Sequence, residues 1–183
     1  IPLPLTPGRS GFTPQLVLSY SSGSGNSEFG LGWNVGLPEI TRKTDKELPQ
    51  YHDLENSDTF ILSGAEDLVP VCASNGDIID TLVGGNKIRT YMPRTEGLNA
   101  KIERITKPDG YVYWRVTGKD NTVSLYGYSA SARIADPENP KRIFSWKLEY
   151  TMDSLGNFAK YSYANDSSPD FASSYLSTVE YGN

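Results

Sequence analysis

The sequence contains one cysteine, one histidine and two methionines among its 183 residues. A single cysteine excludes a disulfide within the chain, and with a single histidine it excludes a zinc site built from these two residue types. Positive charge is also scarce, because 17 Lys and Arg stand against 22 Asp and Glu, giving a net charge of −5. Proteins that bind nucleic acid usually carry a basic face, so we expect no nucleic-acid partner.

Long hydrophobic runs are missing as well. No apolar stretch approaches the ~20 residues that a membrane-spanning helix needs, and the first residues lack the basic and apolar regions of a secretory signal. The chain begins at Ile1 without a methionine and stops at Asn183, directly after a strand-like run. We therefore expect residues 1–183 to be a single fragment whose parent continues on the C-terminal side and on the N-terminal side.

The abundant residues predict an all-β fold of short antiparallel strands with little helix. The 12 Tyr, 6 Phe and 3 Trp argue against disorder, and the 17 Gly and 12 Pro are scattered between alternating segments. The nearest helical candidate, residues 129–135, is stopped by Asp136 and Pro137. Loops are expected at 42–58 and 165–173. We expect strands at residues 15–20, 59–62, 68–73, 77–83, 87–92, 101–106, 111–117, 122–126, 145–152, 158–163 and 175–181.

The charged loop at 42–58 holds the residues that come closest to a catalytic or metal site. His52 is the only histidine, so a Ser–His–Asp or Cys–His arrangement would have to use it, but no Gly-x-Ser-x-Gly elbow accompanies it. Asp53, Glu55 and Asp58 lack the glycine and terminal glutamate of a calcium loop, which favours a solvated acidic loop. We predict no catalytic, cofactor-binding or metal-ligating residues and no cofactor. A hydrolase cleft around His52 is kept as an alternative.

Three other patterns have a structural and a functional interpretation. Residues 23–28 partly match a dinucleotide fingerprint, but Glu28 stands where the third glycine should be, so we expect a turn that lets backbone pass close to large aromatics. Cys72 is expected to be buried and unreactive. The alternating Tyr and Trp residues favour half-buried packing. A carbohydrate-binding or partner-binding β module that uses exposed tyrosines is a further alternative.

Longer strings of residues carry a family resemblance that covers essentially the whole chain. The segments, in order, are IPLPL (1–5), GRSGFTPQL (8–16), LSYSSG (18–23), FGLGW (29–33), PQY (49–51), YMPRTE (91–96), ASARIADP (130–137) and LSTVEYGN (176–183). Together they resemble the SpvB-type domain, which opens the B component of insecticidal toxin complexes (Tc toxins) and also forms the N-terminal part of a plasmid-virulence ADP-ribosyltransferase. In addition, YTMDSLGN (150–157) followed by YSY (161–163) is similar to the tyrosine–aspartate repeats of Rhs-type shells, which are hairpins stacked on their neighbours.

The resemblance implies a structural role in a secreted bacterial toxin complex. The B component resembles half of a hollow β-sheet shell, which joins an Rhs-type C component and holds its cleaved toxic part before the A component pore injects it. In the transferase relative, catalysis belongs to a separate C-terminal domain. The Glu-x-Glu signature of that domain occurs nowhere in this chain. The resemblance thus implies a non-enzymatic shell segment, or alternatively the secretion or translocation domain of a virulence ADP-ribosyltransferase.

The pattern of one strand suggests an open sheet. Tyr111 and Tyr113 share one face of the strand predicted at 111–117, and Val112 and Trp114 share the other. Because both faces of this strand are partly apolar, we expect each face to be covered by other parts of the protein or by cargo. We therefore expect an Rhs-like shell wall segment, more sheet wall than closed unit, whose unpaired edges make the isolated fragment self-associate.

Overall fold

The computed structural model describes residues 1–23, 25–27, 29–45, 47–63, 67–94, 99–168 and 171–182. It confirms an all-β antiparallel fold, in which the helical content of the described residues consists of two short 3-10 turns, η1 (Arg9–Gly11) and η2 (Ala130–Ala132). The described part of the chain holds no helix long and apolar enough to cross a lipid bilayer. The strands are β1 (Leu18–Tyr20), β2 (Asn26–Ser27), β3 (Gly30–Leu31), β4 (Trp33–Val35), β5 (Glu39–Arg42), β6 (Phe60–Leu62), β7 (Asp67–Pro70), β8 (Asp80–Val83), β9 (Asn86–Pro93), β10 (Ala100–Thr106), β11 (Val112–Gly118), β12 (Val123–Tyr126), β13 (Arg133–Ala135), β14 (Ile143–Met152), β15 (Phe158–Ser168) and β16 (Phe171–Tyr181).

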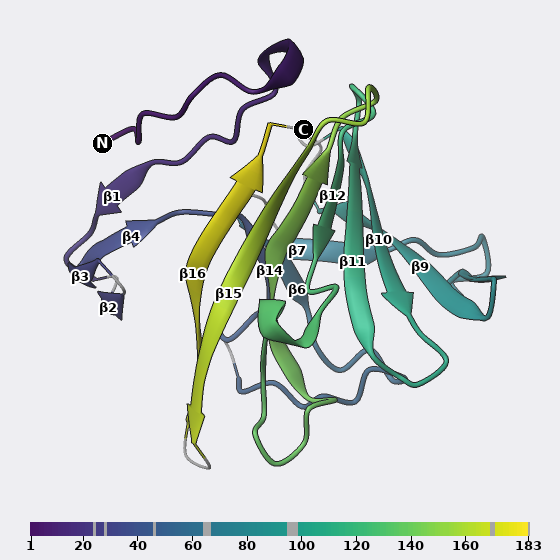
Figure 1. The fold of residues 1–183 in the computed structure, drawn as a ribbon. Coiled ribbons are helices and arrows are strands. Elements are labelled where there is room, and N and C mark those ends of the chain that lie inside the picture. Colours follow the sequence, from purple (N-terminus) through teal and green to yellow (C-terminus); the bar gives the residue numbers. More distant parts are fainter. Residues whose placement is uncertain are drawn as a thin grey trace.

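The main sheet closes into a barrel (Figure 1). Its strands follow the order β12-β11-β10-β9-β7-β6-β5-β14, and β12 then pairs with β14, which completes the ring. The expectation of an open wall is therefore wrong for this part of the chain. The closing pair joins residues far apart in sequence, with Val123 opposite Met152 and Tyr126 opposite Leu148.

Alternation along the strands fills the barrel with aromatic side chains. Trp114 and Trp146 are fully buried and lie edge to face, with ring centroids 5.9 Å apart. Phe60 packs edge-on against both rings, and Trp146 Nε1 donates a hydrogen bond of 2.9 Å to the Val112 carbonyl. Burying an aromatic side chain of this size contributes roughly 2–3 kcal/mol. Val112 and Trp114, which alternation places on one face of β11, are both buried in this core together with Val116.

One glycine is required by this core. Gly127 has a φ of +62°, and a Cβ atom built on it would lie 2.4 Å from Cδ1 of Trp146. Only a residue without a side chain can therefore follow β12 at this point, because the backbone passes directly against the buried indole.

Two appendages extend from the barrel. One is the β15–β16 hairpin, whose strands are 11 residues each. The other is the N-terminal segment, in which β1 pairs with β4 and β2 pairs with β3, while Leu3, Leu5 and Phe12 pack against the core. The predicted polar loop at 165–173 is wrong in its described part, because residues 165–168 and 171–173 continue β15 and β16.

Candidate functional site

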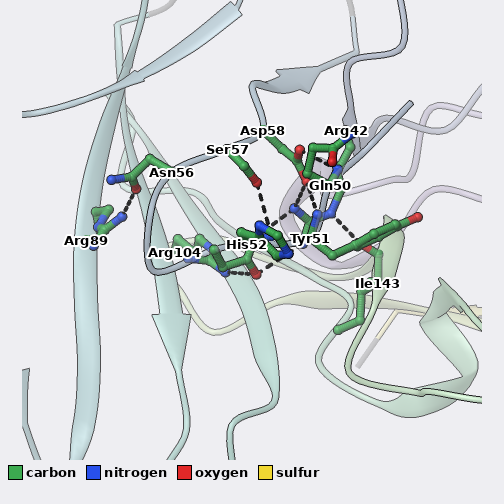
Figure 2. Close-up of polar contacts among 11 residues, drawn as sticks. Arg42, Gln50, Tyr51, His52, Asn56, Ser57, Asp58, Arg89, Arg104 and Ile143 are labelled. Atoms are coloured by element: carbon green, nitrogen blue, oxygen red, sulfur yellow. Dashed lines mark hydrogen bonds and ion pairs between the residues drawn. The ribbon is translucent and has the colours of Figure 1, made fainter. Parts of the chain in front are cut away.

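The loop between β5 and β6, residues 43–59, packs against the inward-facing arginines of the barrel (Figure 2). Its anchor is Arg42, the last residue of β5, which is only 2% exposed. Arg42 shares the inward face of β5 with the fully buried Ile40, so strand alternation forces its guanidinium into the barrel. There its Nε donates a hydrogen bond of 2.7 Å to the Ile143 carbonyl.

Two carboxylates of the loop neutralise this guanidinium. Asp53 accepts hydrogen bonds of 2.7 and 3.1 Å from Nη1 and Nη2 of Arg42, and Asp58 accepts one of 2.5 Å from Nη1. The guanidinium carbon also lies 4.7 Å from the ring centroid of Tyr51 and 5.1 Å from that of Phe60. A buried charge needs such pairing, because an isolated one would be strongly destabilising.

Two further inward arginines extend the cluster. Arg104 of β10 donates to Asp53, and Arg89 of β9 donates to Asn56. Arg89 also forms two hydrogen bonds to Asp80 of β8, of 2.7 and 2.8 Å. We call these side chains the arginine plug, which consists of Arg42, Arg89, Arg104, Asp53, Asn56, Asp58 and Asp80.

The pKa values of Asp58 and Asp80 in the plug are lowered. Burial acts to raise the pKa of Asp58, but the backbone N–H groups of Gln50 and Tyr51 and the Arg42 guanidinium outweigh it and hold the pKa below its ordinary value. The hydrogen bond from Arg89 is the main reason that the pKa of Asp80 falls to about 2. Both carboxylates are therefore ionised at neutral pH and occupied by structural partners.

The proposed hydrolase residues do not come together. The His52 side chain is 67% exposed, and its Nδ1 lies 3.9 Å from a carboxylate oxygen of the still more exposed Glu55, whereas Asp53 and Asp58 are bonded to the guanidiniums of the plug. The residues that the structure describes contain no group of His, Cys, Asp and Glu side chains that could hold a metal ion. The expectation of a solvated acidic loop holds for Glu55 but is wrong for Asp58, whose side chain is only 5% exposed.

The other sequence candidates are structural or isolated. Within the glycine-rich turn at 23–28, Ser24 and Glu28 lie outside the described residues. After this turn, Gly32 sits so close to the Tyr20 ring that a Cβ atom would lie 2.7 Å from it. Cys72 is exposed, so the expectation that it is buried is wrong. The tyrosines are divided, since Tyr91, Tyr126 and Tyr161 are buried, whereas Tyr20 and Tyr128 are exposed.

Sequence reasoning missed the three arginines. A signal was present, because each arginine stands two positions from a residue of the apolar inward face: Arg42 from Ile40, Arg89 from Tyr91 and Arg104 from Ile102. Such placement indicates that a charged side chain lies on the same buried face of the strand as its apolar neighbours. It does not indicate which carboxylates meet that charge, because Asp53 and Asp58 belong to a loop without periodicity.

Comparisons with known proteins agree over the full length of the chain. A family model described as "SpvB: Salmonella virulence plasmid 65kDa B protein" matches residues 1–183. The mono(ADP-ribosyl)transferase SpvB of Salmonella typhimurium is 33% identical over 207 aligned residues, which cover 100% of this chain and 34% of the relative. The chain thus spans about a third of the length of this curated relative.

Solved structures share the fold. The N-terminal domain of effector protein SpvB from Salmonella typhimurium strain LT2 superimposes with a TM-score of 0.83 at 29% identity, covering 100% of this chain and 63% of that one. The crystal structure of TcdB2-TccC3 and the Photorhabdus luminescens Tc holotoxin pore give TM-scores of 0.82 and 0.85 at 30% and 29% identity, each covering 100% of this chain and 9% of the other. The expected family is confirmed: this chain belongs to the SpvB family, and its fold recurs in Tc toxin chains.

Proposed function

We propose that this chain is a non-enzymatic structural segment of a bacterial toxin-complex B component. In this role it contributes to the hollow β-sheet shell that encloses the cleaved toxic part of the C component before the A component pore translocates it. The observation that carries the proposal is the superposition of all 183 residues on 9% of the chain in TcdB2-TccC3 and in the Tc holotoxin pore. We place the assembled complex outside the producing cell.

The side chains support a structural role. In the arginine plug, Asp53, Asp58 and Asp80 are all bonded to guanidiniums of the barrel, and the His52 side chain is largely exposed beside Glu55. A general base needs an available lone pair near a substrate. The plug instead holds the loop at 43–59 on the barrel, and a rigid wall requires its loops to be held in place in this way.

The experiment is a deletion in the parent protein. We expect a B component lacking the segment that corresponds to residues 1–183 to stop protecting the cleaved C-terminal part of its C partner from added protease. Intact B component, with the substitution His52→Ala as a matched control, should retain full protection. Undiminished protection after the deletion would refute the shell role, and loss of function in His52→Ala would revive the hydrolase alternative.

The second candidate is the N-terminal domain of a virulence ADP-ribosyltransferase whose catalysis lies in another domain. The 33% identity to a Salmonella transferase that is about three times longer favours it. We expect purified chain 1–183 to transfer no radiolabelled ADP-ribose from NAD to host-cell extract. The reading frame that follows residue 183 separates the candidates, because a transferase domain supports this one and an Rhs-like region supports the shell.

A further inference from the structure

Asp53 is the member of the arginine plug that joins opposite sides of the barrel. It accepts two hydrogen bonds from Arg42 of β5 and one from Arg104 of β10, and both arginine side chains are buried. In the closed ring, β9, β7 and β6 separate β5 from β10 in one direction, and β11, β12 and β14 separate them in the other. The two guanidiniums therefore meet only inside the barrel, around one carboxylate (Figure 2).

The loop itself does not hold this carboxylate. In the described part of the chain, the hydrogen bonds that Asp53 accepts all come from guanidiniums of the barrel. Asp58, in contrast, also accepts hydrogen bonds from the backbone N–H groups of Gln50 and Tyr51. The Asp53 side chain is 26% exposed, whereas that of Asp58 is almost fully buried. Asp58 is thus fixed in the loop, while a rotation of the Asp53 side chain is enough to carry its carboxylate into water.

The two guanidiniums offer more hydrogen bonds than Asp53 uses. Nε of Arg104 is buried and has no hydrogen-bond partner among the residues that the structure describes, an arrangement that native proteins rarely leave uncompensated. The Phe60 ring, 5.4 Å from the guanidinium carbon of Arg104, supplies only a weaker cation–π contact. Nε and Nη2 share one edge of the planar guanidinium and can donate in parallel to two oxygens of one anion. Asp53 places only Oδ2 on this edge, because its Oδ1 is bonded to Arg42. The site therefore suits a group with more acceptor oxygens than a carboxylate has.

The charge of the plug also favours an anion at this position. The plug contains three guanidiniums, and Lys87 adds a fourth cation, because it pairs with Asp80 at 2.8 Å. Once Asp53 points into water, Asp58 and Asp80 are the carboxylates of the plug that remain opposite these cations. Charges interact strongly in a poorly solvated interior, and a buried cation without a partner is unfavourable. An anion from solution is therefore attracted to the place that Asp53 leaves.

Space for an incoming ion lies beside the plug. A cavity of about 240 Å³ is lined in part by Asn56 and Asp58 of the loop and by Tyr91 of β9. Tyr91 lies opposite Ile102 in the sheet, and Ile102 precedes Arg104 by two residues on the same inward face of β10. The cavity thus reaches the neighbourhood of the Arg104 side chain. A water molecule in the liquid takes up about 30 Å³, so the cavity admits an ion several times that size.

We propose that Arg42 and Arg104 form a binding site for a phosphate group, and that Asp53 occupies this site until the phosphate replaces it. Arginine binds phosphate oxygens in pairs, through the same parallel geometry that it offers to carboxylates. A phosphate group has enough oxygens to meet Nη1 and Nη2 of Arg42 together with Nε and Nη2 of Arg104. This inference goes beyond the shell role and does not depend on it, because it concerns only residues of this domain.

Binding is measured first with the competing carboxylate removed. In Asp53→Ala, inorganic phosphate at about ten times the dissociation constant found by titration calorimetry should lower the urea unfolding equilibrium constant about tenfold, relative to sodium chloride of equal ionic strength. In the unaltered chain the decrease should be at most about threefold, because the tethered Asp53 competes for the site. Formate, which has only two oxygens, should bind more weakly than phosphate, and equal or tighter binding of formate would overturn the choice of ligand. Methyl phosphate distinguishes a phosphate ester from the free ion.

Two variants separate this site from the general effect of phosphate, which stabilises folded proteins because it is excluded from their surface. Asp136→Ala removes a carboxylate that pairs with the exposed Arg142 at 3.5 Å, so it should show only the general effect. Adding Arg104→Met to Asp53→Ala should abolish the specific gain. An equal gain in Asp136→Ala, or a gain that persists without Arg104, would overturn the proposal. If Asp53→Ala does not fold in either salt, Asp53→Asn is titrated instead, since it keeps an acceptor oxygen and removes the charge.

The replacement of Asp53 by phosphate is followed in the unaltered chain. His52 is the only histidine of the sequence and directly precedes Asp53, so the NMR signals of its ring protons report a movement of that carboxylate. At constant pH and ionic strength, we expect phosphate to shift these signals to a plateau in the unaltered chain and to produce no such plateau in Arg104→Met. Phosphate binding by Asp53→Ala without any shift in the unaltered chain would show that Asp53 is a permanent part of the plug, and would refute the replacement.

Discussion

Replacing Arg42 by methionine should cost this domain much of its stability. The substitution keeps an apolar stem but removes the hydrogen bond to the Ile143 carbonyl and the ion pairs to Asp53 and Asp58. Removing one partner of a buried ion pair typically costs 3–5 kcal/mol. Asp53 retains Arg104, and Asp58 retains two backbone donors, so we expect the lower end, about 3 kcal/mol. This corresponds to roughly a hundredfold in the folding equilibrium and to a fall in Tm of about 6–12 °C.

The assay is urea unfolding followed by tryptophan fluorescence, because Trp146 lies in the core beside Arg42. Arg142→Met is the matched control, since Arg142 forms an ion pair with Asp136 at 3.5 Å on the surface. Exposed pairs of this kind contribute about 0–1 kcal/mol. A loss below 1 kcal/mol in Arg42→Met, or the same loss in both variants, would refute the argument that the plug holds the loop on the barrel.

The same variant should change the acid limb of stability. The pKa of Asp58 is lowered in the folded protein, and that of Asp80 is about 2, so both contribute stability above their ordinary pKa near 4 that is lost as the pH falls through the folded values. In Arg42→Met, burial still acts to raise the pKa of Asp58 without the guanidinium to offset it. The Asp58 contribution that acid removes is therefore smaller in the variant, so unfolding measured from pH 7 to pH 3 should show a shallower decline of stability with falling pH than in the unaltered chain, and parallel profiles would contradict this reasoning.

Three further predictions concern the core and the surface. Gly127→Ala should destabilise by about 2–4 kcal/mol through strain and overpacking against Trp146, whereas Gly156→Ala, with a φ of +81° but open space around it, should cost about 1 kcal/mol in the same urea assay. Trp146→Phe should cost about 1 kcal/mol more than Trp114→Phe, because Trp146 donates a hydrogen bond and Trp114 Nε1 has no partner in the described structure; equal losses would show that the indole hydrogen bond contributes nothing. Cys72 should react with one equivalent of a thiol reagent in the folded protein, and resistance to labelling would contradict its exposure.

Period-2 alternation made the strands of the barrel predictable, because it depends only on which side chains face the core. The strands expected at 101–106, 111–117 and 145–152 form as β10, β11 and β14, and Val112 and Trp114, which share one face of β11, are buried. Strand β5 escaped prediction because its four residues, EITR, are too short for alternation to show. The Ser- and Asp-rich stretch after Asn165 has the composition of a loop, yet pairing across the hairpin holds it extended.

Closure of the barrel was beyond sequence reasoning for a different reason. It depends on β14 lying between β12 and β5, and such long-range pairing leaves no local pattern. The arginine plug has the same origin, since Arg42 and Asp53 come together only after residues 43–59 have folded against the barrel. Elements defined by local periodicity were therefore predictable, whereas contacts defined by topology were not.

The distribution of charged side chains and of unpaired backbone groups favours the proposed structural role over an enzymatic cleft. The plug gives Asp53, Asp58 and Asp80 guanidinium partners, which leaves them poorly suited to act as bases or metal ligands. Strand β16 shows the opposite arrangement, because its side chains carry almost no charge and its outer backbone edge has no sheet partner among the described residues. An enzyme cleft needs reactive side chains held beside space for a substrate, whereas a wall needs rigid units with edges that can be extended. This barrel pairs its inward charges with one another and leaves the edge of β16 without a sheet partner among the described residues, so it meets the second requirement. The exposed His52 therefore bears less on the proposed role than the backbone of β16 does.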